Sequence, residues 1–343
     1  MRQKALCALG AALLAAAGAG PAMAAGTVYS DTLTSNGETR SFTYHQPSGT
    51  MTDKPLVIAL HGAGNSGAGF MNGATEGVWN DLSEDRKFWV VYPDGEEIGT
   101  GTHFWNSCNK ATVSGDTDMD GAPDDGGFDP STYNTGSLDD VQFISDLIDW
   151  FDTNKGIDTD RVYVYGSSDG GFMTLRLARE LTGAFKAFAP AISSQYEFNE
   201  CADPNSSTLQ SGGRQMLFLY GDADSYVTTS AGCVSPPATT DCNGGRIEAM
   251  SDAIDYWKTQ FGVDSSGSET AQANPVGLDF TRQYWTDHSR SSNLVLRVVR
   301  VDTGGHTVPG NVQNSWLARV VYQLGWRNLD INHIETTADF FGL

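Results

Sequence analysis

The chain has 343 residues, and 42 Asp and Glu against 21 Lys and Arg give it a formal net charge of −21 at pH 7. A field of this sign repels polyanions, so it argues against nucleic acid, anionic lipid or a polyanionic substrate and favours a neutral or insoluble partner. The length is large for one hydrophobic core but suits a single domain with insertions.

The first 24 residues have the pattern of a secretory signal peptide. Two basic residues, Arg2 and Lys4, precede a short stretch rich in Ala and Leu that ends in Ala22-Met23-Ala24. This pattern predicts cleavage after Ala24. The apolar stretch is too short to span a membrane, and no later run approaches about 18 apolar residues. We therefore expect an exported, soluble mature chain of residues 25–343, with 19 basic side chains and a net charge near −23.

Apolar runs in the first part of the mature chain predict strands. Residues 27–44 are typical of an edge hairpin, and the continuous apolar runs 56–60 and 88–92 are typical of strands buried on both faces. The sequence HGAG follows the first run at residues 61–64. Its glycines allow a turn in which the N–H of Ala63 faces a substrate oxyanion. A plain glycine-rich turn is the alternative interpretation.

Residues 96–137 form a long polar insertion rich in Gly and Asp, followed by a predicted helix over residues 139–151. Trp105, inside the insertion, is a candidate for stacking on a substrate, and a core tryptophan covering the sheet is the alternative. Further on, a D-x-D-x-D-G pattern matches the start of a calcium-binding loop, although its twelfth position is Gly and no flanking helices are evident. Either a structural calcium site or a solvated acidic loop is expected there, formed by Asp116, Asp118, Asp120 and Asp124.

Ser168 is the central residue of the sequence G-S-S-D-G at residues 166–170. An apolar run at 162–165 precedes it and an amphipathic stretch at 172–178 follows, which predicts a strand, a sharp turn and a helix. This is the setting of the G-x-S-x-G nucleophile, with an ordinary strand-to-helix turn as the alternative. In the nucleophile interpretation, the N–H of Asp169 joins that of Ala63 in an oxyanion hole.

More apolar strands are predicted at residues 187–191, 216–220 and 294–301, with a helix over 247–261. Strands and helices alternate along the chain, which predicts an α/β fold with a doubly wound, mostly parallel sheet and helices on both faces. Ligands of such sheets bind beyond the carboxyl ends of the strands. The residues that follow each strand are therefore the candidates for function.

Two of these strand ends carry side chains that complete a catalytic set with Ser168. The sequence GDAD follows the strand at 216–220, and His306 follows the strand at 294–301. A carboxylate can orient the imidazole of His306, which can in turn take the proton of Ser168. Asp224 is the better candidate for the acid because Asp222 falls within the tight turn, but Asp222 stays open. The chain order Ser, Asp, His is that of α/β-hydrolases.

Four cysteines remain once Cys7 leaves with the signal peptide. An even number in an exported protein implies two disulfides, with three possible connectivities. Cys233 and Cys242 flank a short loop and favour one bridge, which leaves Cys108 with Cys201. Irregular spacings and the lack of a nearby His pair argue against a metal cluster.

This succession of motifs resembles the polyhydroxybutyrate (PHB) depolymerase and feruloyl esterase family of secreted serine esterases. The resemblance implies Ser168 as nucleophile, Asp224 as acid and His306 as base. Asp169 departs from the family, which often has Asn there, and Ala63 stands where many depolymerases have Cys. The matching segments cover nearly all of the mature chain: residues 56–62, 92–95, 105–106, 139–144, 158–164, 166–171, 221–224, 304–306, 309–310 and 340–341.

The resemblance implies ester hydrolysis through an acyl-enzyme by a secreted monomer, with no cofactor needed for catalysis. The first hypothesis is an extracellular polyester depolymerase of the PHB type, acting on a neutral or insoluble polymer. The second is a feruloyl or acetyl-xylan esterase acting on plant cell-wall polysaccharide. The third is a non-catalytic binding protein on the same scaffold, which a complete triad disfavours. The departures from the family concern the substrate rather than the reaction.

Overall fold

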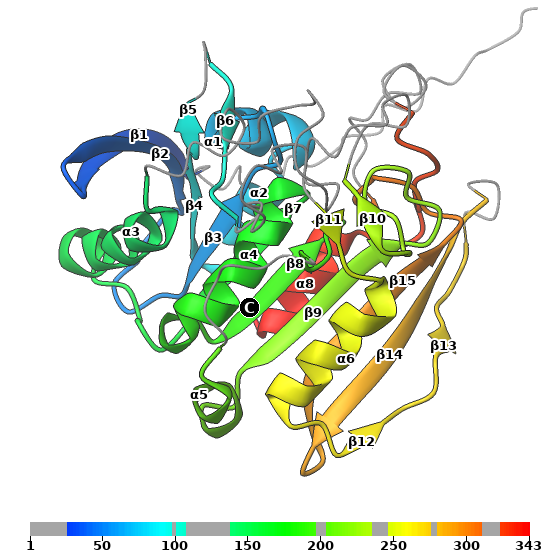
Figure 1. The fold of residues 1–343 in the computed structure, drawn as a ribbon. Coiled ribbons are helices and arrows are strands. Elements are labelled where there is room, and N and C mark those ends of the chain that lie inside the picture. The colour runs from blue at the N-terminus through cyan, green and yellow to red at the C-terminus, as the bar shows by residue number, and fades with distance from the viewer. Residues whose placement is uncertain are drawn as a thin grey trace, which may run out of the picture.

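A computed structural model describes residues 26–97, 101–107, 138–196, 204–234, 246–275, 280–310 and 323–343. Their centre is an eleven-stranded sheet (Figure 1). Ten strands follow one another across it: β1 (Thr27–Ser35), β2 (Glu38–Gln46), β4 (Trp89–Pro93), β3 (Leu56–Leu60), β7 (Val162–Ser167), β8 (Ala187–Ala191), β9 (Gln215–Gly221), β15 (Asn293–Asp302), β14 (Arg282–Arg290) and β12 (Ser265–Ser266). The eleventh, β13 (Thr270–Ala271), also pairs with β14.

The six middle strands, from β4 to β15, are parallel, whereas both edges of the sheet are antiparallel. At one edge, β1 and β2 form the predicted hairpin. Its two-residue turn is Asn36-Gly37, where both residues have positive φ, the conformation that matches the twist of a tight hairpin. The prediction of a mostly parallel sheet is confirmed.

Helices cover both faces of the sheet (Figure 1). One face carries α3 (Asp140–Lys155), α4 (Asp169–Glu180) and α6 (Met250–Phe261), and the other carries α2 (Val78–Arg86) and α8 (His333–Phe341). Helix α3 begins where the Asp139 side chain accepts from the N–H of Gln142, and it ends at Gly156 in the left-handed conformation. Shorter helical turns are α1 (Gly67–Gly69), η1 (Phe70–Ala74), η3 (Thr182–Ala184) and α5 (Ser206–Ser211).

The central strands are apolar on both faces because each face packs against helices. In β3, Leu56, Ile58 and Leu60 belong to the core with α3, α4 and α6, while Val57 and Ala59 belong to the core with α2 and α8. All five side chains are buried. Burial of this kind, at about 25 cal/mol per Å² of apolar surface, stabilises the sheet as a rigid base. The carboxyl ends of β3, β7, β9 and β15 therefore have fixed positions at one edge.

Several elements differ from the sequence-based expectations. The strand β14 and the helices α2 and α8 were not predicted, and α6 begins at Met250 rather than at Ile247, which lies in β11 (Arg246–Ile247). The partner of β11 is β10 (Gly232–Cys233). From the polar insertion at 96–137, the structure describes a short hairpin of β5 (Glu96–Glu97) and β6 (His103–Phe104).

Some predictions fall outside the described residues. These are the signal peptide, the calcium pattern of Asp116, Asp118, Asp120 and Asp124, and the cysteines Cys108, Cys201 and Cys242. Cys233 lies on β10, and the two disulfides stay a prediction. Within the described residues, no helix has both the length and the apolar character that a membrane crossing needs.

Candidate active site

Ser168 lies on the sharp turn between β7 and α4. Its φ of 58° and ψ of −120° are an uncommon conformation for a residue with a side chain, and its N–H donates to the carbonyl of Ala191 at 2.9 Å. The turn is possible because glycines stand two residues before and two residues after Ser168. A Cβ on Gly166 would lie 1.9 Å from the carbonyl oxygen of Gly170, and a Cβ on Gly170 would lie 2.4 Å from that of Leu60. The G-x-S-x-G spacing is therefore a steric requirement of this turn.

The side chains of Ser168, His306 and Asp224 form one continuous chain of hydrogen bonds. The Nε2 atom of His306 lies 2.9 Å from the Oγ of Ser168, and its Nδ1 lies 2.8 Å from the Oδ2 of Asp224. Because a carboxylate only accepts, Nδ1 carries the proton and Nε2 is left to accept from the serine hydroxyl. The three groups that the sequence predicted from separate strand ends are thus brought together.

The carboxylate of Asp224 is held rigidly. Its side chain is only 2% exposed, and its Oδ1 accepts from the N–H groups of Tyr226 and Val227 at 2.8 and 3.0 Å. The Tyr226 ring stacks on His306 with 5.0 Å between ring centres and 25° between planes. These contacts fix both the carboxylate and the imidazole, a function that the sequence did not suggest for Tyr226.

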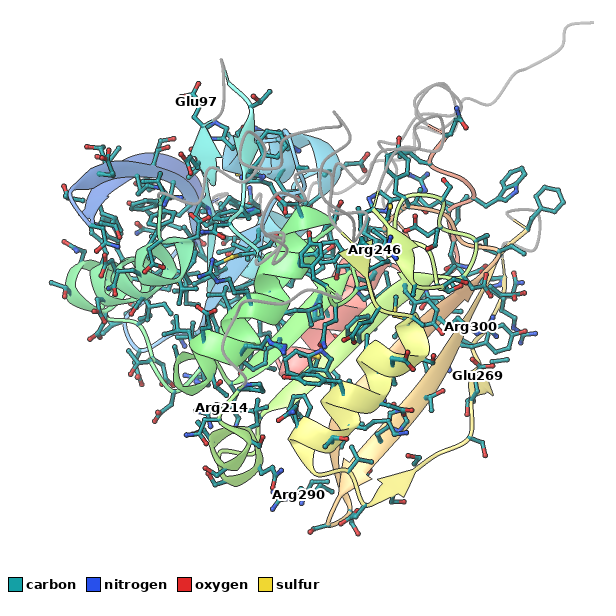
Figure 2. The ribbon with its side chains drawn as sticks, viewed as in Figure 1. Glu97, Arg214, Arg246, Glu269, Arg290 and Arg300 are labelled. Atoms are coloured by element: carbon teal, nitrogen blue, oxygen red, sulfur yellow. The ribbon has the colours of Figure 1, made fainter. Side chains whose placement is uncertain are left out.

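Asp222, the alternative acid, points elsewhere. Its carboxylate pairs with Arg300 at 2.6 Å and accepts from the N–H of Thr303, also at 2.6 Å. Arg300 also binds Glu269, and Figure 2 shows these two side chains close together along the β13–β15 edge. Asp222 therefore supports the turn that leads into His306, and Asp224 is the carboxylate that contacts the imidazole.

The loop after β3 passes beside Ser168. A Cβ on Gly62 would lie 3.4 Å from the Cβ of Ser168, so the loop backbone is close to the nucleophile. Ala63 is exposed, and Asp169 is the first residue of α4, whose N-terminal N–H groups lack partners within the helix. Among the described residues, neither the N–H of Ala63 nor that of Asp169 donates to a backbone carbonyl in a turn, a loop or a helix cap. Donation by both groups to a substrate oxygen stays a prediction.

His61 supports this loop as a neutral side chain. Burial lowers its pKa to about 4, so the ring is uncharged at neutral pH. Its Nδ1 donates to the carbonyl of Gly62 at 2.8 Å, and its Nε2 accepts from the N–H of Gly95 at 3.0 Å. The ring thus joins the loop after β3 to the turn after β4.

Trp105 occupies the core rather than an open surface. The residue is 2% exposed, its ring lies 4.9 Å from that of His61, and its Nε1–H donates to the carbonyl of His61 at 2.9 Å. A ring buried to this degree has no open face in the structure, so it favours a core function, and stacking of Trp105 on a substrate stays a prediction. The alternative interpretation of a packed tryptophan agrees with the structure.

The side chain of Asp169 faces the segment that contains Trp105. Its Oδ2 accepts from the N–H of Trp105 at 2.9 Å, and its Oδ1 accepts from the hydroxyl of Ser107 at 3.1 Å. Removal of the carboxyl group from water, with a further contribution from the charge of Asp140, raises its pKa to about 7. The sequence signal for this arrangement was the Asp at a position where the resembling family often has Asn.

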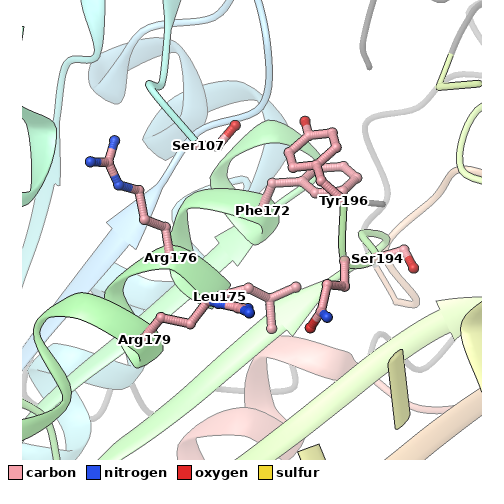
Figure 3. Close-up of a pocket in the computed structure, with 8 residues that line it drawn as sticks. Ser107, Phe172, Leu175, Arg176, Arg179, Ser194 and Tyr196 are labelled. Carbon is pink, nitrogen blue, oxygen red and sulfur yellow. The ribbon is translucent and has the colours of Figure 1, made fainter. Parts of the chain in front are cut away.

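An aromatic pair lies next to these groups. Phe172 of α4 stacks on Tyr196 with 4.4 Å between ring centres. Figure 3 shows both rings with Ser107 at one end of a small pocket beside α4. Phe172 also donates its N–H to the carbonyl of Ser168 at 3.0 Å, so this apolar wall is one helical turn from the nucleophile. Within the described part of the chain, no group of three or more His, Cys, Asp or Glu side chains is placed to hold a metal ion.

Known proteins resemble this chain over different lengths. Poly(3-hydroxyalkanoate) depolymerase C of Paucimonas lemoignei is 31% identical over 153 residues, which are 45% of this chain and 31% of that protein. Putative esterase NocK of Nocardia uniformis subsp. tsuyamanensis is 25% identical over 283 residues, or 80% and 72% of the two chains. Acetylxylan esterase A of Aspergillus ficuum is 23% identical over 289 residues, or 79% and 82%. No family model matches the sequence.

The fold agrees with these relatives. The acetyl xylan esterase structure from Aspergillus awamori superposes with a TM-score of 0.52 and 18% identity, and the match covers 92% of this chain and 99% of that one. The relatives are a polyhydroxyalkanoate depolymerase and esterases, and the structural match shows the α/β fold of such an esterase. This confirms the family expected from the motifs. The chain matches only about a third of the length of the depolymerase, so that protein's activity does not transfer with the family.

Proposed function

We propose that this protein is a carboxylic ester hydrolase that acts through an acyl-enzyme on Ser168. The observation that carries the proposal is the hydrogen-bond chain from Ser168 through His306 to Asp224, with both distances between 2.8 and 2.9 Å. This arrangement of nucleophile, base and orienting acid is the one that activates a serine hydroxyl. The esterases among its relatives support the same reaction class.

The reaction proceeds in two halves. His306 takes the proton of Ser168 as the serine oxygen attacks the ester carbonyl, and Asp224 stabilises the imidazolium that forms. The alcohol leaves with the proton from Nε2, and the acyl group stays on Ser168. Water then attacks the acyl-enzyme with His306 again as the base, which frees the acid and restores the serine. The N–H groups of Ala63 and Asp169 donate to the oxyanion, and each is worth about 3 kcal/mol in the transition state.

The proposed substrate is an uncharged or insoluble ester polymer outside the cell. The net charge of −21 disfavours anionic substrates, and the predicted signal peptide supports export. We place an aliphatic polyester of the PHB type first, because the depolymerase relative is 31% identical over its matched 153 residues. Acetylated xylan is the second candidate, because the acetylxylan esterase match extends over 79% of this chain. The proposal also includes a monomeric state and catalysis without a cofactor. A structural calcium ion is part of the same proposal.

The test is hydrolysis by the purified mature chain and two variants. Wild-type protein, Ser168→Ala and the control Ser251→Ala, an exposed serine on α6, are assayed on p-nitrophenyl butyrate, PHB film, acetylated xylan and methyl ferulate. We expect wild type and Ser251→Ala to hydrolyse the butyrate ester and PHB, and Ser168→Ala to lose at least 10⁴-fold in kcat/KM. Full activity of Ser168→Ala would refute the nucleophile. Hydrolysis of methyl ferulate or acetylated xylan alone would replace the polyester as the proposed substrate. An inactive wild type that binds the polymer would favour a non-catalytic binding protein.

A further inference from the structure

The two N–H groups proposed for the oxyanion lie on different elements. That of Ala63 belongs to the loop after β3, and that of Asp169 belongs to the first turn of α4. An oxyanion donor acts at about 2.7–3.1 Å, and a misplacement of about 1 Å can cost about 100-fold in rate, so the spacing of the two elements matters for the rate. The segment of residues 103–107, which we name the bridging segment, contacts both elements.

The bridging segment is bonded to the loop after β3 at two points. The N–H of Gly64 donates to the carbonyl of His103 at 2.9 Å, beside a β-bridge between Asn65 and His103. The indole N–H of Trp105 donates to the carbonyl of His61 at 2.9 Å. The loop that contains Ala63 is therefore fixed to the bridging segment at both of its ends.

On its other side, the bridging segment is bonded to the start of α4 through one carboxyl group. The two oxygens of Asp169 accept from the N–H of Trp105 and from the hydroxyl of Ser107. Ser107 is only 2% exposed, so water does not compete for these bonds. Asp169 thus joins the turn at Ser168, through the bridging segment, to the loop at Ala63.

Charged groups around the bridging segment hold one of its residues, Asn106. Asp140 of α3 accepts from the N–H of Asn106 at 2.7 Å, and Arg176 of α4 donates to its carbonyl at 2.5 Å. Asp140 is itself neutralised by Arg40 of β2 at 2.6 Å, and Tyr196 approaches Asp169 from beyond β8. The carboxyl of Asp169 is the member of this network that lies next to the nucleophile.

We propose that the side chain of Asp169 is a positioning residue that sets the spacing of the two oxyanion donors by holding the bridging segment against α4. The inference rests on the proposed ester hydrolysis. It gives Asp169 two separate functions, since its backbone N–H contacts the oxyanion while its carboxyl acts through Trp105 and Ser107. Donor spacing affects the transition state more than the bound ester, so loss of the carboxyl lowers kcat and leaves KM nearly constant.

The hydrogen-bond chemistry supplies a conservative variant. In Asp169→Asn, the amide oxygen can accept from the N–H of Trp105, and the amide NH₂ can donate to Ser107, whose hydroxyl can turn to accept. Asp169→Ala removes both bonds and leaves the N–H of Trp105 without an acceptor. The Asn variant therefore keeps the bridging segment in place, and the Ala variant releases it.

The experiment measures kcat and KM on p-nitrophenyl butyrate for wild type, Asp169→Ala, Asp169→Asn and Ser107→Ala. Titration with a fluorophosphonate counts the reactive serines, so that kcat refers only to folded sites. Asp264→Ala is the matched control, because it removes an exposed aspartate that accepts one N–H, from Ser291, in a turn far along the chain. If Asp169→Ala does not fold, Ser107→Ala tests the same connection without changing α4.

We expect Asp169→Ala to lose about 100-fold in kcat per titrated site, with KM within about threefold of wild type. Asp169→Asn should recover to within about tenfold of wild type, Ser107→Ala should lose about fivefold, and Asp264→Ala should match wild type. A kcat of Asp169→Ala within threefold of wild type, or equal losses in the Ala and Asn variants, would overturn the positioning function. An inactive wild type would instead overturn the proposed function and this inference together.

Discussion

On the β9–β15 side of the site, Asp224 and His306 meet directly through their side chains. On the β3–α4 side, hydrogen bonds through residues 103–107 and the carboxyl of Asp169 link the elements that carry two backbone N–H groups. The first side uses two residue types whose chemistry is recognisable in a sequence. The second uses backbone groups, whose positions depend on packing between distant parts of the chain. The comparison predicts large losses of rate from single changes on the first side and mixed losses of rate and stability on the second.

The largest effect should come from removing the base. His306→Ala leaves no group to take the proton of Ser168, and we expect a loss of about 10⁶-fold in kcat, as for removal of a triad histidine elsewhere. The change is measured with p-nitrophenyl butyrate at pH 8, with Ser251→Ala, at an exposed serine of α6, as the control. Activity of His306→Ala within about 100-fold of wild type would exclude His306 as the base.

The next effect separates the two neighbouring aspartates. Asp224→Asn removes the charge that stabilises the imidazolium and favours the wrong tautomer, so we expect a loss of about 10⁴-fold in kcat. Asp222→Asn alters only the contacts with Arg300 and Thr303, and a loss of less than about tenfold is expected. The ratio of the two kcat values is the measurement. Similar losses of kcat in both variants would mean that the conformation of the turn, rather than the charge beside His306, determines the rate.

On the β3–α4 side, the raised pKa of Asp169 should make the free energy of unfolding depend on pH. Its pKa is raised from 3.8 to about 7 in the folded protein, so the native state keeps a proton that the unfolded chain releases between about pH 4 and pH 7. The free energy of unfolding therefore falls as pH rises through this range, by up to about 4 kcal/mol from this group. Asp169→Asn removes this dependence.

Urea unfolding at pH 4.5, 6 and 8 measures this pH dependence of the free energy of unfolding. The stability of Asp169→Asn relative to wild type should increase with pH, whereas Asp149→Asn, an exposed aspartate of α3, should follow wild type at every pH. A constant difference between Asp169→Asn and wild type across these three pH values would contradict the raised pKa.

The smallest effect concerns Trp105. Trp105→Phe keeps a ring against His61 but removes the N–H that binds the carbonyl of His61, and we expect a loss of about 1–3 kcal/mol in the free energy of unfolding. The change in KM should be less than twofold, because the ring is not exposed to substrate. Trp326→Phe is the control, since Trp326 is 50% exposed. A tenfold increase in KM for Trp105→Phe, with no such increase for Trp326→Phe, would show that Trp105 contacts the substrate.

The same comparison explains what the sequence could predict. Strands such as β3, β4 and β7 are short and mostly apolar, and the residues just after the central strands are therefore recognisable as a site. Ser168, Asp224 and His306 follow directly from that placement. The strand β14 has mixed polar and apolar residues because it lies near a sheet edge, and its pattern therefore gave no clear period. The contacts of Asp169 with Trp105 and Ser107 span more than 60 residues, and no local pattern encodes them.

The central claim, that Ser168 forms the acyl-enzyme, is tested most directly by labelling with a fluorophosphonate. Peptide mass spectrometry locates the label, and residual ester hydrolysis is measured in the same samples. The account predicts one label per chain on Ser168, with activity lost in proportion to labelling, and no label on Ser168→Ala. Complete labelling of Ser168 with activity retained, or inactivation that follows a label on another residue, would contradict it.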